Sequence, residues 1–180
     1  MRNFVGAGAF VTFGDLASSR AEALVTELGF DKVGFVPCDV RSWADQAALF
    51  KTASSKHGGN IDIVFANAGI SGSDPVFNDT SESNTDEPVE PDLSILQTNL
   101  VGFMYTAKLA LHYFARQKPA SAGERDRCLI MTSSLAGYAD HNGAPQYSAA
   151  KFGTRGMMRS LRRMLPKQDA RVNVIAPWCV

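Results

Sequence analysis

The sequence predicts an α/β fold, in which a doubly wound parallel sheet carries helices on both of its faces. Short apolar runs alternate with helical patterns along the chain, and strict alternation of strand and helix favours right-handed βαβ units. No stretch of the sequence repeats. Because 180 residues is an ordinary length for one domain, we expect a single domain over residues 1–180.

The expected elements of the first half follow from the spacing of apolar residues. Leu24, Val25 and Leu28 have helical spacing, and Gly29 suits the end of that helix. Ser42 is a suitable N-cap for the next helix, which we expect to end near Gly58. The expected strands are 9–13, 32–37 and 61–66, and the expected helices are 16–28 and about 43–58.

The second half is expected to contain two longer helices and two strands. These are a helix over about 92–116, a strand over 128–132, a helix over about 145–165 and a strand over 172–176, which Pro177 ends. An acidic segment, residues 71–92, precedes them and has no Lys or Arg; its seven acidic residues are Asp74, Asp79, Glu82, Asp86, Glu87, Glu90 and Asp92. Loops of that length are usually functional or mobile, so we expect it to border the site.

Composition and charge argue against several classes of function. Lys and Arg number 18, as do Asp and Glu, so we expect no broad basic face for nucleic acid or anionic lipid. No apolar run approaches the roughly 18 residues that a membrane helix needs. Cys38, Cys128 and Cys179 form no CxxC pair, so neither a zinc site nor a disulfide framework is indicated.

The N-terminus loosely imitates a signal peptide, since Arg2 precedes a mostly apolar run at 4–13. Asp15, however, falls before any plausible cleavage site, and a buried strand explains the same residues. The sequon Asn78-Asp79-Thr80 matters only in a secreted protein. We therefore expect a cytoplasmic protein, and a secreted glycosylated binding module is the least favoured of the alternatives.

Tyr147 and Lys151 are the strongest chemical signal in the sequence. On a helix they are i and i+4, so both side chains project from one face. A phenol has an ordinary pKa of about 10, and a nearby ammonium stabilises the phenolate and lowers that pKa. The pair is therefore a candidate general acid/base, with Lys151 adjusting the acidity of Tyr147. Taken alone, the same spacing occurs by chance on many solvated helices.

Ser134 adds a second polar group at the expected carboxyl end of the strand 128–132. That edge of an open parallel sheet is where ligands bind. A hydroxyl at this position can donate to a substrate carbonyl while Tyr147 passes the proton. The alternative for Ser133 and Ser134 is a purely structural helix or turn cap.

Several motifs in a fixed order carry a resemblance to a known family. They are Ser134 with Tyr147 and Lys151, Asn67-Ala68-Gly69 after a strand, Asn99 in Thr98-Asn99-Leu100-Val101-Gly102, and Asp39 in Cys38-Asp39-Val40. Together they resemble the classical short-chain dehydrogenase/reductase family over residues 8–180, and with it a Rossmann-like fold. The segments 13–16 and 176–178 look most like fungal members that resemble 15-hydroxyprostaglandin dehydrogenase.

The resemblance implies a catalytic group of four residues. Tyr147 would be the catalytic acid/base, and Lys151 would lower its pKa and hold the nicotinamide ribose hydroxyls. Ser134 would orient and polarise the substrate carbonyl. Asn99 would support a water in the proton relay, its alternative being a polar residue that faces solvent on a long helix.

The resemblance also implies a set of cofactor-binding residues. Asn67, Ala68 and Gly69 would lie against the cofactor. Asp39 would accept from the adenine amine beside Val40, its alternative being a turn residue at a strand end. Val180 would contact the nicotinamide carboxamide through its backbone. Tyr147 and Lys151 belong to this set too.

Asp15 bears on the choice of cofactor, because it is expected to end a strand. A carboxylate there can accept hydrogen bonds from the adenosine ribose hydroxyls and repels a 2′-phosphate, so NAD is favoured over NADP. The alternative, an N-cap of the helix 16–28, is compatible with that role.

The chain also departs from the family pattern. The family begins with a strand and a glycine-rich turn that holds the pyrophosphate. Here Gly6-Ala7-Gly8 precedes a strand and no third glycine completes the motif. We therefore expect a sheet that lacks the family's first and last strands, with two inner edges left unpaired.

Two main functions follow. The first is an NAD(P)-dependent oxidoreductase that interconverts a secondary alcohol and a ketone, and that forms a homo-oligomer through the helices near 92–116 and 145–165. The second is a catalytically impaired, truncated relative, or an interaction partner of an intact one. The sequence does not identify the substrate.

Overall fold

The computed structural model describes residues 1–16, 19–72, 74, 90–117, 126–139 and 141–178. The strands are β1 (Val11–Asp15), β2 (Val33–Pro37), β3 (Ile63–Ala66), β4 (Arg127–Thr132) and β5 (Ala170–Ile175). The helices are α1 (Arg2–Gly6), α2 (Ser19–Leu28), α3 (Trp43–Ser55), α4 (Ser94–Leu96), α5 (Gly102–Arg116) and α6 (Pro145–Leu161). A π-helical turn, Gln97–Val101, joins α4 to α5, and 3₁₀ turns cover His57–Gly59, Leu135–Gly137 and Leu165–Gln168.

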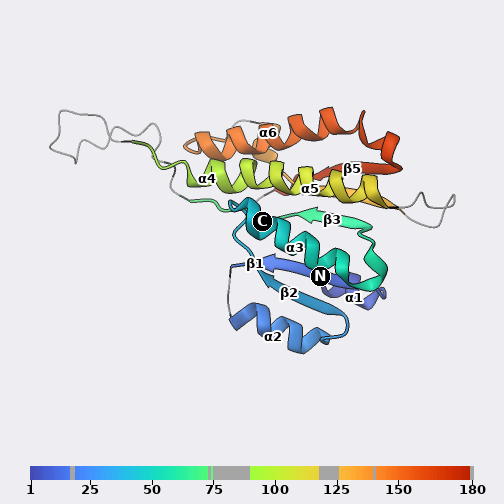
Figure 1. Cartoon of the computed structure of the whole chain (residues 1–180). Helices are drawn as coiled ribbons and strands as arrows, with labels where there is room; N and C mark the ends of the chain where they lie inside the picture. The colour runs from blue at the N-terminus through green and yellow to red at the C-terminus, as the bar shows by residue number, and fades with distance from the viewer. Residues whose placement is uncertain (17–18, 73, 75–89, 118–125, 140, 179–180) are drawn as a thin grey trace.

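All the strand pairs in the described part of the chain are parallel, but they form two sheets. One contains β1 and β2, with Val11 opposite Val33, and the other has the order β3-β4-β5. Figure 1 shows β1 next to β3 and pointing in the same direction, without pairing between them. The predicted α/β fold with a parallel sheet is confirmed, and so are the unpaired inner edges.

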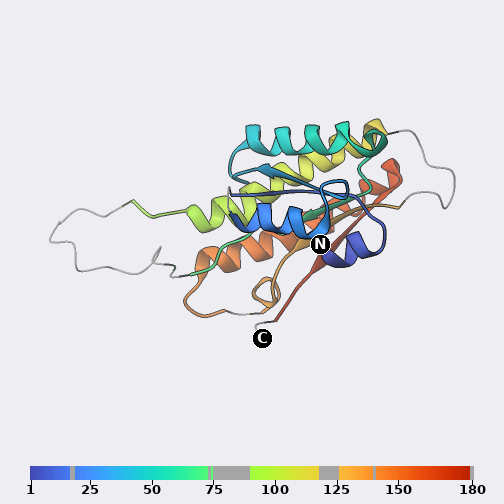
Figure 2. The same ribbon diagram turned by 90° about the horizontal axis from the view of Figure 1, so that it is seen from below.

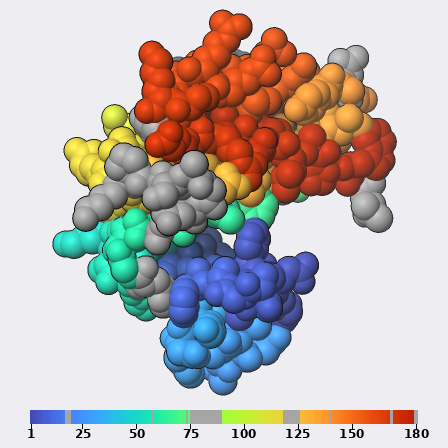
Figure 3. All heavy atoms as spheres, turned by 90° about the vertical axis from the view of Figure 1, so that its right-hand side faces the viewer, coloured from blue at the N-terminus to red at the C-terminus, as the bar shows by residue number. Residues whose placement is uncertain are grey.

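The hydrogen bonds that β1 makes to β2 show which of its peptide groups lie on its inner edge. Val11 donates to the Lys32 carbonyl and the Asp15 carbonyl accepts from Cys38, so these residues face β2. Because peptide groups alternate in direction along a strand, those of Thr12 and Gly14 point toward β3. Figure 3 shows a hollow at this place, between the N-terminal part of the chain and the rest. Sheet hydrogen bonds therefore do not hold the two halves together.

The contact between α3 and α5 joins the two halves. Helix α3 packs on β1 and β2, and α5 packs on β3 and β4. Gln46 of α3 is 2% exposed, and its amide nitrogen donates to the carbonyls of Val40 (2.6 Å) and Gly102 (2.9 Å). Its amide oxygen accepts from the Thr106 hydroxyl at 2.7 Å. One buried side chain thus connects the segment after β2 to the start of α5.

The helices lie on both faces of the β1–β2 sheet, and Figure 2 shows α3 and α2 on opposite sides of it. The main core lies between α3, α5, α6 and the β3–β4–β5 sheet. Its fully buried large side chains include Phe103, Phe114, Leu129, Met131 and Leu165. Burial alternates along β3. Val64 and Ala66 face the core, whereas Ile63 and Phe65 are exposed.

The N-terminal boundaries differ from those expected. Residues 2–6 form a short helix that the sequence patterns did not predict, and the first strand begins at Val11 instead of Ala9. The N–H groups of Ala7, Gly8 and Ala9 bond back to carbonyls of Asn3, Phe4 and Val5, so they are not available to the sheet. Helix α2 begins at Ser19, so Asp15 does not cap it directly; the Asp15 carboxylate accepts from the neighbouring Leu16 N–H.

The later boundaries are closer to expectation. Ser42 caps α3 by accepting from the Asp45 N–H, as predicted. Helix α6 ends at Leu161 instead of 165, because Pro166 has no N–H to donate and its ring clashes with the preceding turn. The helix expected over 92–116 begins at Ser94 and contains the π-helical turn.

We predict that Gln46→Leu weakens the joint between the two halves. The leucine has a similar volume but removes the amide donor of the Val40 carbonyl, whereas the Gly102 carbonyl keeps the Thr106 hydroxyl at 3.0 Å. Loss of the donor to one buried carbonyl costs about 1–3 kcal/mol, and the free energy of unfolding should fall by that amount. Urea denaturation measures this. Lys51→Leu on the exposed side of the same helix is the control, and an equal loss in both variants would contradict the assignment.

Candidate active site

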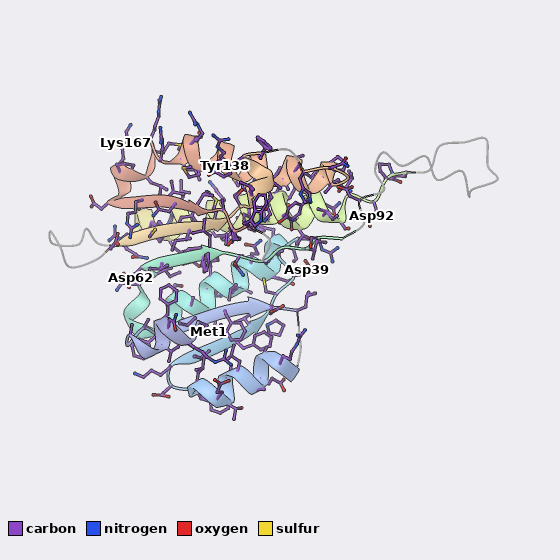
Figure 4. All side chains as sticks on the ribbon, turned by 180° about the vertical axis from the view of Figure 1, so that it is seen from behind. Met1, Asp39, Asp62, Asp92, Tyr138 and Lys167 are labelled. Carbon is purple, nitrogen blue, oxygen red and sulfur yellow. The ribbon has the colours of Figure 1, made fainter. Side chains whose placement is uncertain are left out.

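The predicted site residues follow the carboxyl ends of four parallel strands. Asp15 ends β1, Asp39 follows β2, Asn67-Ala68-Gly69 follows β3, and Ser134 follows β4. Figure 4 shows Asp39 and Asp92 at this end of the molecule, opposite Asp62, which precedes β3. The fold therefore directs these segments to the edge at which open parallel sheets bind ligands.

Tyr147 and Lys151 lie together on α6. The Lys151 Nζ is 5.3 Å from the centroid of the Tyr147 ring and 5.4 Å from that of Phe103. Lys151 is 3% exposed, and its Nζ donates to the Thr132 carbonyl at 2.9 Å. The Ser133 hydroxyl donates to the Lys151 carbonyl, also at 2.9 Å. The end of β4 thus fixes both the backbone and the ammonium of Lys151.

Burial lowers the pKa of Lys151, because removal from water disfavours its charged form. Within the described residues, the ammonium has one hydrogen-bond acceptor, the Thr132 carbonyl. An ammonium has three N–H donors, so two of them remain for other oxygens. A buried cation with unused donors is a suitable partner for hydroxyl groups of a ligand or for a phenolate.

Ser134 begins the 3₁₀ turn Leu135–Gly137. Its hydroxyl accepts from the Ala136 N–H at 3.2 Å, so Ser134 caps this turn, which was the structural alternative to its catalytic role. Gly137 brings the turn against α6, since a Cβ there would lie 2.7 Å from the Lys151 carbonyl oxygen and 2.6 Å from the Ser133 Oγ. The hydroxyl proton of Ser134 is not used in that cap and can be donated to a ligand.

Asn99 is fully buried in the π-helical turn, so it is not a solvent-facing residue of a helix. Its amide accepts from the Ile70 N–H at 2.9 Å and donates to the Ile70 carbonyl at 2.8 Å. Both bonds tie the loop after β3 to the helix. A Cβ on Gly69 would lie 3.1 Å from the Asn99 Oδ1 and 3.8 Å from the Lys151 Nζ, so this loop, Asn99 and Lys151 are close neighbours.

Asn67 connects the same loop to β4, because its Oδ1 accepts from the Thr132 hydroxyl at 2.9 Å. Thr132 therefore contacts Asn67 through its side chain and Lys151 through its carbonyl. Ala68 lies between Asn67 and Gly69 and is exposed. The structure thus brings together Asn67, Gly69, Asn99 and Lys151.

Asp15 and Asp39 lie on the β1–β2 half. Asp15 is exposed, and its carboxylate accepts from the neighbouring Leu16 N–H at 2.8 Å. Asp39 forms a double hydrogen bond with the Arg41 guanidinium, which lowers the pKa of the Asp39 carboxyl. Val40 packs against Gly102, where an added Cβ would lie 3.0 Å from the Val40 carbonyl oxygen. Asp39 thus has a structural partner that the sequence patterns did not indicate.

Some of the predicted features lie outside the described residues. These are Val180, the sequon at Asn78, and Asp79, Glu82, Asp86 and Glu87 of the acidic segment. One residue of that segment has a role that the patterns did not indicate, since Asp74 is 5% exposed and accepts two hydrogen bonds from Gln146. Its only sequence signal was its place among other acidic residues.

A hollow of about 420 Å³ lies beside the site, lined by Ala139, the loop 141–145, Ser148 and Phe152. The His141 ring lies 6.1 Å from the Tyr147 ring, between centroids, and thus connects this hollow to the site. Ser134, Tyr147 and Lys151 do not line it. We therefore do not assign the hollow to the reacting part of a substrate.

A comparison with protein families agrees with this arrangement. The family described as short chain dehydrogenase matches residues 1–180. The chain belongs to the short-chain dehydrogenase family. The predicted resemblance is thereby confirmed, while the finer likeness to 15-hydroxyprostaglandin dehydrogenase stays a prediction.

Similar proteins from fungi share about a third of the sequence. The short-chain dehydrogenase/reductase prx4 of Penicillium rubens is 37% identical over 143 residues, which cover 79% of this chain and 40% of that protein. The 5'-hydroxyaverantin dehydrogenase of Dothistroma septosporum is 34% identical over 189 residues, covering 98% of this chain and 61% of the relative. The chain therefore spans about half the length of these two relatives.

The fold also matches a solved structure. A short chain dehydrogenase from Mycobacterium smegmatis superposes with a TM-score of 0.76 at 24% identity, covering 95% of this chain and 66% of the other. This likeness supports the Rossmann-like fold. Among the described residues, none of the helices is long and apolar enough to cross a membrane.

The lowered pKa of Lys151 predicts a pH-dependent stability. Between this pKa and the ordinary value of about 10.4, the unfolded chain binds more protons than the folded chain, so stability should rise with pH across that interval. In Lys151→Met the free energy of unfolding should not show this rise with pH, although it can differ from that of the wild type by a constant amount. Urea denaturation of both proteins from about pH 8 to 10.5 measures the difference. Lys108→Met, which removes an exposed ammonium, is the control and should keep the rise; parallel curves for wild type and Lys151→Met would contradict the prediction.

Proposed function

We propose that this protein is an NAD(P)-dependent oxidoreductase that interconverts a secondary alcohol and a ketone. The observation that carries the proposal is the buried Lys151 ammonium, held by the Thr132 carbonyl beside the Tyr147 ring with two donors unused. Membership of the short-chain dehydrogenase family supports the class of reaction. The relative named 5'-hydroxyaverantin dehydrogenase supports a hydroxylated substrate.

Tyr147 is proposed to move the proton of the reacting hydroxyl. In the direction of oxidation, the Tyr147 phenolate accepts that proton as the alcohol becomes a ketone, and in reduction the phenol returns it. The Lys151 ammonium lies 5.3 Å from the centroid of the same ring, where its positive charge stabilises a phenolate. The Ser134 hydroxyl donates to the substrate oxygen and fixes its position. Asn99 holds the loop at Ile70 through two hydrogen bonds and supports a water in the relay.

The residues present fit part of a nicotinamide dinucleotide. The unused N–H donors of Lys151 suit the ribose hydroxyls next to the nicotinamide, and the exposed carboxylate of Asp15 suits the adenosine ribose. Asn67, Ala68 and Gly69 are proposed as the cofactor-facing loop, Asp39 with Val40 is proposed for the adenine, and Val180 for the carboxamide. When bound, the nicotinamide supplies or accepts the hydride.

NAD is proposed in preference to NADP, because the Asp15 carboxylate would repel a 2′-phosphate. Asp15 is exposed at the carboxyl end of β1, so its carboxylate is accessible to hydroxyl groups of a ligand. Asp39, the other acidic residue of the predicted cofactor-binding set, is already bound to Arg41.

We also propose one domain over residues 1–180 that forms a homo-oligomer through α5 and α6. Met104 on α5 and Phe152 on α6 are 47% and 45% exposed, although both helices belong to the core. Exposed large apolar side chains on neighbouring helices are typical of contact surfaces between proteins.

A second function is a non-catalytic partner of an intact relative. The open edges of β1 and β3 favour it, since unpaired strand edges readily pair with other chains. A thermal melt with and without excess NADH separates the two functions. NADH at 100 times its Kd stabilises a binding protein by about 2.7 kcal/mol, so a rise in the melting temperature supports the oxidoreductase and an unchanged transition supports the partner.

Tyr147→Phe is predicted to abolish turnover but not cofactor binding. Loss of a general acid/base lowers rates by about 100-fold or more, while the ring and its contact with Lys151 remain. The assays are NADH oxidation with ketones and the NADH-dependent melting shift. Tyr138→Phe, which keeps the ring under Arg155, is the control. Residual turnover within a few-fold of wild type would be inconsistent with the role of Tyr147.

Asp15→Ala is predicted to reduce the preference for NAD. The substitution removes both the acceptor for the ribose hydroxyls and the charge that repels a 2′-phosphate. The ratio of kcat/KM with NAD to that with NADP should fall by about tenfold or more. A wild-type protein that already prefers NADP would show that the interpretation of Asp15 is wrong.

A further inference from the structure

The N-terminus of α6 lacks a cap of its own. The N-cap residue Ala144 offers no side-chain hydrogen bond, and the first turn contains no acidic residue. The first N–H groups of a helix need acceptors and favour negative charge nearby. This helix carries Tyr147 and Lys151, so the acceptor at its start bears directly on the site.

Asp74 supplies that acceptor from the loop after β3. Its Oδ2 accepts from the Gln146 backbone N–H at 2.6 Å, and its Oδ1 accepts from the Gln146 side-chain amide at 3.0 Å. Asp74 and Gln146 are each 5% exposed. A carboxylate 72 residues away in the chain thus caps the helix one residue before Tyr147.

Gln146 extends this link to the start of α4. The same amide nitrogen donates to the Asp92 carbonyl at 2.8 Å, and the amide oxygen lies 3.4 Å from the Leu96 N–H. Asn99 binds the loop at Ile70, four residues before Asp74. The loop after β3 is therefore fixed at two points, one beside Asn99 and one beside Tyr147.

We propose that Asp74 and Gln146 are positioning residues that set the orientation of Tyr147 relative to Lys151 and Asn99. Neither acts on the substrate. Asp74 fixes the first turn of α6 against the loop after β3, and Gln146 fixes it against the start of α4. Small displacements of a catalytic group lower rates strongly, up to about 100-fold for 1 Å. The kinetic part of this proposal rests on the proposed function, whereas the structural part does not.

Three variants of the full chain test the proposal. Asp74→Ala removes both hydrogen bonds to Gln146. Asp74→Asn keeps an acceptor for the Gln146 N–H, because asparagine caps helices as well as aspartate does. Asp92→Ala is the matched control, since the Asp92 carboxylate accepts from Ser94 and its contact with Gln146 runs through the backbone carbonyl.

Hydrogen exchange of the Gln146 amide and the ¹³C signal of Tyr147 are the primary measurements, because both can be read without turnover. The Tyr147 signal is identified as the one that is missing from the spectrum of Tyr147→Phe. In Asp74→Ala we expect the amide to exchange about tenfold faster or more and the Tyr147 signal to shift. In Asp74→Asn and Asp92→Ala, exchange should stay within about threefold of wild type.

Turnover adds a second measurement. In Asp74→Ala we expect kcat to fall about tenfold or more while the KM for the cofactor changes by less than about twofold, and Asp74→Asn should restore most of kcat. A wild-type chain without turnover would count against the proposed function alone, since exchange and the Tyr147 signal still test the positioning. Unchanged exchange and an unchanged Tyr147 signal in Asp74→Ala would overturn the proposal. If Asp74→Ala does not fold, Asp74→Asn must fold with near-wild-type exchange, and its failure to do so would also overturn the proposal.

Discussion

The contact of Gln46 with Val40, Gly102 and Thr106 is the interaction on which the arrangement of this chain depends. Among the described residues, the β1–β2 sheet and the β3–β4–β5 sheet form no ladder with each other, and the contact between α3 and α5 joins them. Buried polar groups lose free energy when their partners are removed, which makes a fully satisfied Gln46 a specific joint. This joint fixes Asp15 and Asp39 relative to Tyr147 and Lys151.

The part of the site on the β3–β4–β5 half depends less on the Gln46 contact. Lys151, Ser133, Thr132, Asn67 and Asn99 are connected by hydrogen bonds within the β3–β4–β5 half and its helices. The nicotinamide end of the proposed cofactor site therefore lies on the β3–β4–β5 half, and the adenosine end on the β1–β2 half. A change in the angle between the two sheets would alter the span available to a dinucleotide without disturbing the acid/base pair.

Sequence patterns identified the strands and helices because their signals are local. Ser42 was predicted as an N-cap from its neighbours alone, and the alternation of strand and helix predicted the parallel sheet. The short helix at 2–6 was not predicted, since five residues within an apolar run have no clear period. The roles of Gln46 and Asp74 could not be predicted either, because their partners lie 56 and 72 residues away and a single Gln or Asp has no pattern.

In the candidate site, too, local sequence patterns predicted some features, whereas contacts between distant residues were not predicted. The pair Tyr147 and Lys151 follows from spacing on one helix, but the acceptor that holds Lys151 is a backbone carbonyl, and any residue at 132 could supply it. Backbone groups carry no sequence signal, and in this site they bind Lys151, Asn99 and Gln146. The family's motifs therefore predict which side chains react, whereas parallel strand order and helix contacts decide how those side chains are held.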